Sequence, residues 1–586
     1  MTFDQNIASD PNISVWVSAN AGTGKTKVLT DRVLRLLLSG CPPQKILCIT
    51  YTKAAASEME HRIEAQLGSW AIDDDEILKQ KLEVLMGKTA DAKTLKFARQ
   101  LFANIIDAPQ RVRIQTIHGF CQSILKKFPL EAGVPPHFTL IDNNISQILL
   151  EEAKKKLFEV DDARLKNAIN NFAEKITESS FNNIIANIIE DKGKFSNWFS
   201  EKNGAESLIT KLLEKTAANI NESEEDLFFK HFSYSEHEIK SLKIVANLMS
   251  ESDSKIENEK SKAIFDFLES GFSYKKYEEY SSVLITTKYT PRVTVLNKPL
   301  AKRSPDSLDF MRLEQERVFN FSEKLRTLRN TKLTCEIICL AEYLLGIYQG
   351  LKNQNCYLDY DDIIINTVNL LSHKSATAWV LYKLDGGIDH LLLDEAQDTS
   401  PLQWQLIDRL TEEFFSGYGT SSDKNRTLFV VGDGKQSIFS FQGAKPDEFN
   451  KMQSLLRKRI ANSGLEFRNI RLNLSFRSTQ PVLKAVDDVF AQEPANIGLM
   501  FDDGAINHAV YRKGMAGRVE LWDVVEVAEP EYTPDWEAAA DQVESRKAKI
   551  VLAQKIATEI KKWFDEKRKL PSSNKAIEAG DIMILV

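Results

Sequence analysis

The feature that most constrains this chain is a glycine-rich turn, Ala19-Asn-Ala-Gly-Thr-Gly-Lys-Thr26, between a segment of strand character and one of helix character. The apolar run Ile13-Ser-Val-Trp-Val-Ser18 predicts a short buried strand, and residues 25–38 carry apolar side chains at helical spacing. A glycine turn that opens a helix points backbone N–H groups and the positive helix end at a phosphate. The order strand, glycine turn, helix therefore predicts an α/β fold with a phosphate-binding loop.

Individual residues of this turn suit nucleotide binding. Lys25 has the length to reach the β- and γ-phosphates, and the Thr26 hydroxyl can ligate Mg²⁺. Ala19 stands where the usual pattern begins with glycine, but Gly22 and Gly24, the positions closest to the phosphates, are present. An ordinary turn between a strand and a helix is the alternative. The predicted nucleotide contacts are Ala19, Asn20, Ala21, Gly22, Thr23, Gly24, Lys25 and Thr26.

A second segment strengthens the nucleotide interpretation. The apolar run Ile388-Asp-His-Leu-Leu-Leu-Asp394 predicts a strand that ends in two adjacent carboxylates, Asp394 and Glu395. Such a pair can hold Mg²⁺ through its first acid and orient or deprotonate water through its second. A random acidic pair is more often a solvated loop, but this pair lies where a parallel strand ends and α/β sheets bind their ligands.

Length and composition set further limits. The 586 residues are enough for three or four domains, and 43% hydrophobic and 27% charged residues describe a soluble chain with large cores. No apolar run approaches membrane-spanning length, the N-terminus has no signal pattern, and six cysteines make no disulfide framework. We expect a cytoplasmic protein without membrane contact. Cys335 and Cys339 are four residues apart, and two buried thiols explain them better than a structural metal site.

A basic stretch offers two interpretations. The net charge of −7 does not indicate nucleic acid, but seven cationic residues follow a loop that carries Phe439 and Phe441. The stretch is equally consistent with a solvated helix face and with a single-stranded nucleic acid site, where bases stack on rings and phosphates follow positive charge. The cationic residues are Lys451, Arg457, Lys458, Arg459, Arg468, Arg471 and Arg477.

The pattern along the chain predicts four segments. Residues 1–143 and 356–468 have α/β character, whereas residues 144–355 have helical periodicity and few strand signals. A last unit, residues 469–586, is expected to contain strands at 470–474 and 519–525. Residues 581–586 form an apolar run that predicts a further strand, and because a buried strand is an improbable place for a domain to stop, we expect this unit to be incomplete.

A series of motifs runs along the chain in the order Gln5, Ala21–Thr26, Ile49–Ala56, Gln115–Phe120, Asp359–Asp362, Asp394–Asp398, Val431–Gly443 and Asn473–Ser478. This series resembles the motifs of superfamily 1 DNA helicases of the UvrD/Rep/RecB type. Three further segments, at 16–22, 101–109 and 128–138, are most similar to AddA, the helicase–nuclease subunit of bacterial double-strand-break repair, in its alphaproteobacterial form.

The resemblance implies a fold and a role for each motif residue. The fold is a P-loop RecA-like motor domain built from residues 1–143 and 356–468, with a large helical insertion (1B-like) at 144–355 and an incomplete second RecA-like domain at 469–586. In the nucleotide site, Gln5 reads the adenine edge, Phe476 stacks on the adenine, Lys25 holds the phosphates, Thr26 and Asp394 hold Mg²⁺, Glu395 is the catalytic base, and Gln436 and Arg477 contact the γ-phosphate. The residues implied to face single-stranded DNA are Thr52, Thr116, His118, Phe439 and Phe441.

The implied function is that of the ATP-binding N-terminal half of a DNA helicase or translocase in double-strand-break repair. ATP and Mg²⁺ are the implied cofactors. The implied partners are single-stranded or duplex-end DNA, a polypeptide with the C-terminal helicase and nuclease half, and an AddB-like subunit. The isolated chain is expected to be a weak ATPase because the family's later motifs are absent from it. The alternatives are a DNA- or subunit-binding module with little turnover and, less favoured, a P-loop ATPase that is not a helicase.

Overall fold

The computed structural model describes residues 2–107, 111–200, 204–372, 379–380, 383, 387–415, 425–437, 445–497, 508–525, 548–571 and 573–585. The chain divides into two compact units. Residues 1–137 and 362–586 form unit 1, and residues 138–361 form unit 2.

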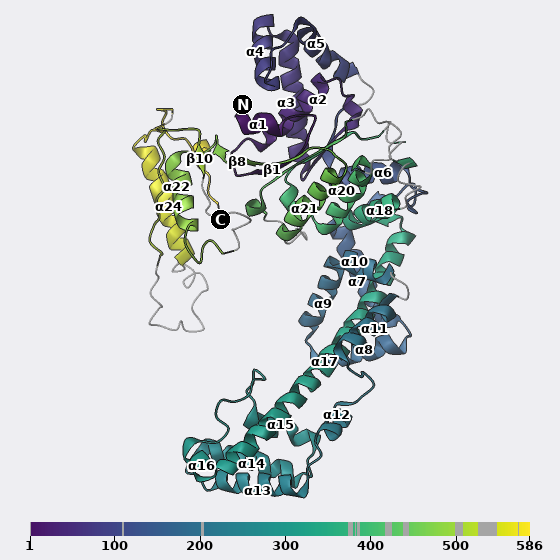
Figure 1. Ribbon diagram of the computed structural model, residues 1–586, viewed down its shortest axis with the longest axis vertical. Helices are drawn as coiled ribbons and strands as arrows, with labels where there is room; N and C mark the ends of the chain where they lie inside the picture. The colour runs from purple at the N-terminus through teal and green to yellow at the C-terminus, as the bar shows by residue number, and fades with distance from the viewer. Residues whose placement is uncertain are drawn as a thin grey trace, which may run out of the picture. The chain divides into compact units, whose positions relative to one another are not determined.

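A six-stranded parallel sheet is the centre of unit 1, with strand order β3-β2-β6-β7-β1-β8 (Figure 1). Each neighbouring pair in this order is parallel, so the carboxyl ends of all six strands lie at one edge. This is the edge at which α/β sheets bind ligands. The strands are β1 (Ser14–Ala19), β2 (Ile46–Thr50), β3 (Arg113–Thr116), β6 (His390–Leu393), β7 (Thr427–Gly432) and β8 (Phe467–Leu472).

The glycine turn lies where the sequence predicts it, between β1 and helix α2 (Lys25–Leu38). Val15, Trp16 and Val17 of β1 are fully buried, as expected for a central parallel strand covered on both faces. The apolar stripe of α2 packs against β1 and β7 in the same core. The predicted strand, turn and helix are therefore confirmed.

The described part of unit 1 contains further α-helices. They are α1 (Phe3–Ala8), α3 (Lys53–Ile72), α4 (Asp75–Met86), α5 (Ala92–Asp107), α6 (Ile117–Lys127), α18 (Tyr360–Ser372), α20 (Pro401–Glu412), α21 (Pro446–Asn462), α22 (Gln480–Phe490) and α24 (Ala548–Asp565), with a short parallel strand pair, β9 (Leu474–Ser475) and β10 (Ala509–Val510). The helices α4 and α5 were not predicted from the sequence. In α4, Leu78, Leu82 and Leu85 follow helical spacing and are buried.

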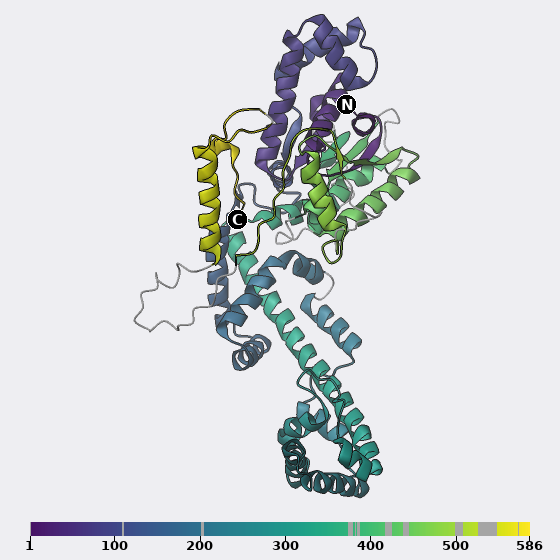
Figure 2. The same cartoon turned by 90° about the vertical axis from the view of Figure 1, so that its left-hand side faces the viewer.

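Unit 2 is helical apart from one short parallel pair, β4 (Thr139–Leu140) and β5 (Tyr357–Leu358). Its axis is α17 (Pro305–Gln354), a helix of 50 residues that runs the length of the unit in both views (Figures 1 and 2). One apolar cluster gathers around residues 340–351 of α17 and another around residues 311–325. The first involves α7 (Asn143–Glu159), α8 (Ala163–Lys175), α9 (Glu178–Glu190) and α10 (Lys192–Ser200), and the second α12 (Glu224–His231), α13 (Glu236–Ser250), α14 (Lys255–Glu269), α15 (Tyr274–Leu284) and α16 (Lys298–Arg303). The helix α11 (Gly204–Thr216) also packs against α17.

The fold class, an α/β P-loop fold with a parallel sheet and a large helical insertion, is confirmed by these two units. Within the described ranges, every helix falls short of the length and apolarity that a membrane span requires.

Two predicted strands are wrong. Residues 519–525 and the described residues 581–585 form no strand. Leu521 and Leu585 are 99% and 88% exposed, because no neighbouring strand in the described part of the chain pairs with these segments or covers them. Apolar residues alone do not make a strand, which needs a hydrogen-bonded neighbour. The strand predicted at 470–474 is present as β8 and β9, and β8 pairs with β1 at the edge of the main sheet.

Candidate nucleotide site

The glycine turn has a backbone conformation that only glycine adopts freely. Gly22 and Gly24 have φ angles of 76° and 87°, in the left-handed region. A Cβ atom at Gly22 would lie 2.6 Å from Cβ of Arg477, so the turn also approaches the segment after β9 closely. That approach is fixed by the Phe476 N–H, which donates to the Gly22 carbonyl at 2.8 Å. The two segments implied to hold the nucleotide are thus joined by their backbones.

Lys25 is the first residue of α2 and points at two groups from other strands. Its Nζ lies 3.3 Å from Oε2 of Glu395, which follows β6, and 3.4 Å from Oε1 of Gln436, which follows β7. Lys25 is mostly buried and Glu395 is about a third exposed. Lys25 is therefore joined at the carboxyl edge of the sheet by two residues that lie hundreds of positions later in the sequence, as the motif roles require.

The acidic pair lies directly after β6. Asp394 is buried and continues the sheet by donating its N–H to the Ile49 carbonyl at 2.9 Å. Burial, followed by the charge of Glu395, raises the pKa of Asp394 to about 6. Glu395 has φ 49°, a left-handed conformation that is strained for this residue type and recurs at functional sites. The turn directs the two carboxylates differently, one into the protein and one toward Lys25.

These oxygen donors fit a Mg²⁺ ion. Mg²⁺ binds one or two protein oxygens together with phosphates, and a buried carboxylate whose ionisation is opposed by its surroundings is stabilised by a cation. The Thr26 hydroxyl, in the first turn of α2, and the Asp394 carboxylate are the residues that would hold the ion, and its charge would offset that of the phosphates.

Gln5 lies beside the glycine turn, although it comes from α1. Its side chain is buried, and Nε2 donates to the Thr23 carbonyl at 3.1 Å. Its Oε1 accepts from the Thr2 N–H, closing a capping box at the start of α1. Gln5 thus supports the loop in this structure, while its contact with adenine stays a prediction. Arg32 of α2 fixes the chain after α1, because its buried guanidinium donates to the carbonyls of Ala8, Asp10 and Ile13.

Three of the five residues implied to face DNA, Thr52, Thr116 and His118, lie at the same edge of the sheet. Thr52 follows β2 and caps the N-terminus of α3, and Thr116 ends β3 and caps α6; their hydroxyls accept from the N–H groups of Ala55 and Gly119. His118 is in the first turn of α6. Phe439 and Phe441 lie outside the described residues.

Three further residues belong to this site and were not predicted. Lys435 donates to Oδ1 of Asn20 at 2.7 Å and so ties the glycine turn to the segment after β7. Tyr511 contacts Phe476, with ring centroids 4.8 Å apart. Gln397 donates to Glu395. Lys435 and Gln397 lie inside motif segments, but only tertiary contacts show what they do.

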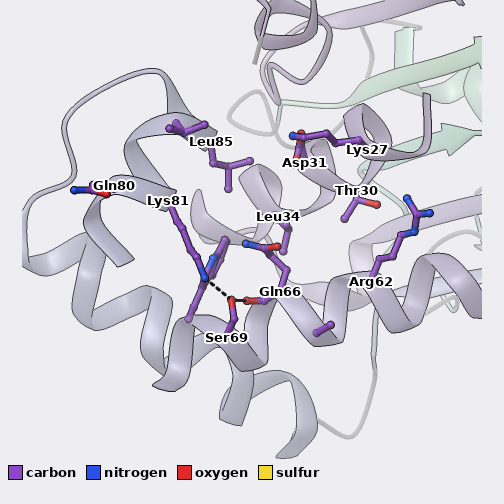
Figure 3. A pocket seen from close by; sticks show the side chains of 13 residues that line it. Lys27, Thr30, Asp31, Leu34, Arg62, Gln66, Ser69, Gln80, Lys81 and Leu85 are labelled. Atoms are coloured by element: carbon purple, nitrogen blue, oxygen red, sulfur yellow. Dashed lines mark hydrogen bonds and ion pairs between the residues drawn. The ribbon is translucent and has the colours of Figure 1, made fainter. Parts of the chain in front are cut away.

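A separate cleft of about 860 Å³ lies between α2, α3 and α4 (Figure 3). Its charged side chains are already paired. Lys81 contacts Ser69 and Asp73, Lys27 contacts Asp31, and Arg62, also on the lining, contacts Glu58. The lining contains no glycine turn, and we assign no nucleotide to this cleft.

Comparison with known proteins agrees with the geometry. The family model of the UvrD/REP helicase N-terminal domain matches residues 1–457. Three similar proteins are each named as a subunit of an ATP-dependent helicase/nuclease. The Lactobacillus gasseri protein is 24% identical, covering 83% of this chain and 39% of that protein. The Lactobacillus helveticus protein is 24% identical (98% and 47%) and the Enterococcus faecalis protein 25% identical (82% and 37%). The chain therefore spans less than half the length of these relatives.

Proposed function

Because this chain belongs to the UvrD/REP helicase family, we propose that it is the ATP-binding motor part of a DNA helicase or translocase that acts in double-strand-break repair. The meeting of Lys25, Glu395 and Gln436 at the carboxyl edge of the sheet carries this proposal. These are a phosphate-binding cation, a carboxylate able to act as a base, and an amide able to contact the γ-phosphate.

Nucleotide phosphates would compete with Glu395 for Lys25. ATP phosphates are stronger partners for Lys25 than one partly exposed carboxylate, because they carry more charge and meet the N-terminus of α2. When Lys25 turns to the phosphates, Glu395 loses its cation and is free to accept a proton from the attacking water. Arg477, beside the glycine turn, then supplies positive charge at the γ-phosphate.

The sheet order supports a DNA site beside the nucleotide site. The nucleotide groups follow β1, β7 and β6, whereas Thr52 and Thr116 follow β2 and β3 on the other half of the same edge. With strands about 4.8 Å apart, β1 and β2 are separated by roughly 14 Å. The N-termini of α3 and α6 lie at this half of the edge, and helix N-termini favour the binding of phosphate. The hydroxyls of Thr52 and Thr116 accept hydrogen bonds from the backbone, and each still has a hydrogen that it can donate to DNA.

Hydrolysis that depends on DNA tests this function. Single-turnover ATP hydrolysis by the 586-residue chain should rise when single-stranded DNA is added, and Glu395→Gln should abolish it while leaving Mg·ATP binding intact. Nucleotide binding with no hydrolysis under either condition would favour the alternative, a nucleotide-dependent binding module.

The names of the relatives point to a complex, since each describes one component of a larger helicase/nuclease. We infer that the partners of this chain are DNA ends and an AddB-like subunit. Co-expression with the second component from the same genome, followed by size-exclusion chromatography, tests the protein partner. Elution of the two polypeptides as separate species would contradict it.

A further inference from the structure

Gln397 lies between the candidate base and the segment that follows β7. It belongs to a short 3₁₀ turn, η2 (Ala396–Asp398), and is only 2% exposed. Its Nε2 donates to Oε2 of Glu395 at 2.7 Å, and its Oε1 accepts from the Asp433 N–H at 2.9 Å. Its own carbonyl accepts from the Ser437 hydroxyl at 3.3 Å. One buried residue therefore contacts the base directly and the next segment twice.

The orientation of this amide follows from its partners. The Asp433 N–H can only donate, so the amide oxygen must face it, and the NH₂ group then faces the Glu395 carboxylate. The end of β7 leaves room for this arrangement. A Cβ atom at Gly432 would lie 2.7 Å from Oε1 of Gln397, so a side chain at that position would displace the amide.

Among the residues that the structure describes, Glu395 has two side-chain partners within hydrogen-bond distance, Lys25 at 3.3 Å and Gln397 at 2.7 Å, both at Oε2. In the proposed function, Lys25 leaves Glu395 when it binds the phosphates of ATP. Gln397 then remains to fix the carboxylate, which must keep one orientation to meet the attacking water. The same amide accepts a hydrogen bond from the Asp433 N–H. Asp433 begins the segment 433–437, which includes Gln436, the residue implied to contact the γ-phosphate.

We propose that Gln397 is a positioning residue, which holds the Glu395 carboxylate for hydrolysis and couples its position to the segment Asp433–Ser437. This inference rests on the proposed function and extends it to a residue outside the predicted nucleotide and metal contacts. Movement of that segment on ligand binding shifts the Gln397 amide, and the amide shifts the base. The site therefore orients its base only when the segment after β7 is in place.

Two substitutions of similar size separate this role from a role in folding. Gln397→Met keeps the length of the side chain and removes its three hydrogen bonds, the two donated to Glu395 and Asp398 and the one accepted from the Asp433 N–H. Gln397→Glu keeps an acceptor for the Asp433 N–H but places a carboxylate against Glu395, where the parent chain has a donor. A purely structural Gln397 would therefore tolerate Gln397→Glu better than Gln397→Met, whereas a positioning Gln397 tolerates neither.

A nearby glutamine provides the matched control. Gln403 is also buried, at 8% exposure, and its Oε1 accepts from the Ser400 N–H at 3.1 Å, at the start of α20. The change Gln403→Met also replaces a buried glutamine amide by a thioether, in the same region of unit 1. It should leave the hydrolysis rate close to that of the parent chain.

The experiment measures single-turnover hydrolysis of Mg·ATP with the 586-residue chain in excess over nucleotide and single-stranded DNA present, together with the Kd for Mg·ATP. Both Gln397 variants should hydrolyse about 10- to 100-fold more slowly, the usual cost of losing a group that orients a metal-site residue. Their Kd for Mg·ATP should stay within about threefold of the parent value, because Lys25 and the glycine turn are unchanged.

The outcomes separate this inference from the function on which it rests. A parent rate in Gln397→Glu would overturn the inference and leave the proposed function intact, and so would equal slowing by Gln403→Met. Loss of Mg·ATP binding together with hydrolysis in both Gln397 variants would also overturn it, since it would make Gln397 part of the fold of the binding site. A parent chain that neither binds nor hydrolyses Mg·ATP would refute the proposed function itself.

Discussion

Asp394 should make nucleotide binding depend on pH. Its pKa of about 6 lies well above the ordinary value of 3.8, because burial and then the charge of Glu395 oppose its ionisation. A protonated carboxyl is a poor ligand for Mg²⁺, so binding of Mg·ATP must first remove this proton. Affinity should therefore fall as the pH drops below about 6 and should be constant above it.

The magnitude follows from the position of the pKa. One pH unit below it, about one molecule in eleven has an ionised Asp394, so Mg·ATP should bind about tenfold more weakly at about pH 5 than at about pH 8. The same shift affects stability in the absence of nucleotide. The folded chain keeps the proton to a higher pH than the unfolded chain, so stability falls as the pH rises from about 4 to about 6 and then levels off. Asp394→Asn should recover up to about 3 kcal/mol above pH 6 and nothing near pH 4.

Isothermal titration calorimetry tests both halves of this prediction. Titrations of Mg·ATP in two buffers with different ionisation enthalpies should show about one proton released per nucleotide near pH 5 and almost none near pH 8. ATP itself also releases protons in this pH range. The variant Asp394→Asn is the control, because its proton release on binding comes from the nucleotide alone. If the parent chain and Asp394→Asn showed the same pH slope, the assignment of Asp394 as the titrating ligand would be wrong.

Three other changes have expected outcomes. Gly22→Ala should weaken Mg·ATP binding at least tenfold, measured by fluorescence titration, because its φ of 76° is strained for alanine and its Cβ would meet Arg477 at 2.6 Å; parent affinity would show that the turn moves freely. Arg32→Met should lower the free energy of unfolding, followed by urea and circular dichroism, by about 3 kcal/mol or more, since the carbonyls that it binds are left buried without a donor; a change below about 1 kcal/mol would contradict this. Phe476→Ala should weaken ATP binding by roughly 1–3 kcal/mol if its ring stacks on adenine, with inorganic triphosphate as the control ligand that must bind unchanged.

The parts of the fold that sequence reasoning predicts well are those set by short-range patterns. The helix at residues 25–38 begins at the glycine turn and ends within the same range in the structure, because apolar spacing and glycine conformation are local properties. Strand partners are not local. The apolar residues at 519–525 suit a strand in the same way as β1, yet β1 lies between β7 and β8 while 519–525 pairs with no strand in the described chain.

The candidate site shows the same division. Lys25, Glu395 and Gln436 were predicted separately from motifs, and the parallel order of β1, β7 and β6 brings them together. Gln397 lies inside the motif Asp394–Asp398, but its contact with Glu395 was not predicted, because the role of its amide is clear only once both partners are known. Tyr511 was missed for the same reason, since its contact with Phe476 depends on the pairing of β9 and β10.

The most direct test of the account is equilibrium binding of Mg·ATP to three chains: the parent, Lys25→Ala and Glu395→Gln. We expect Glu395→Gln to bind Mg·ATP as tightly as the parent chain or more tightly, because the competing ion pair with Lys25 is lost. We expect Lys25→Ala to bind Mg·ATP at least tenfold more weakly. Equal affinity of Lys25→Ala and the parent chain would contradict the assignment of the glycine turn as the ATP site.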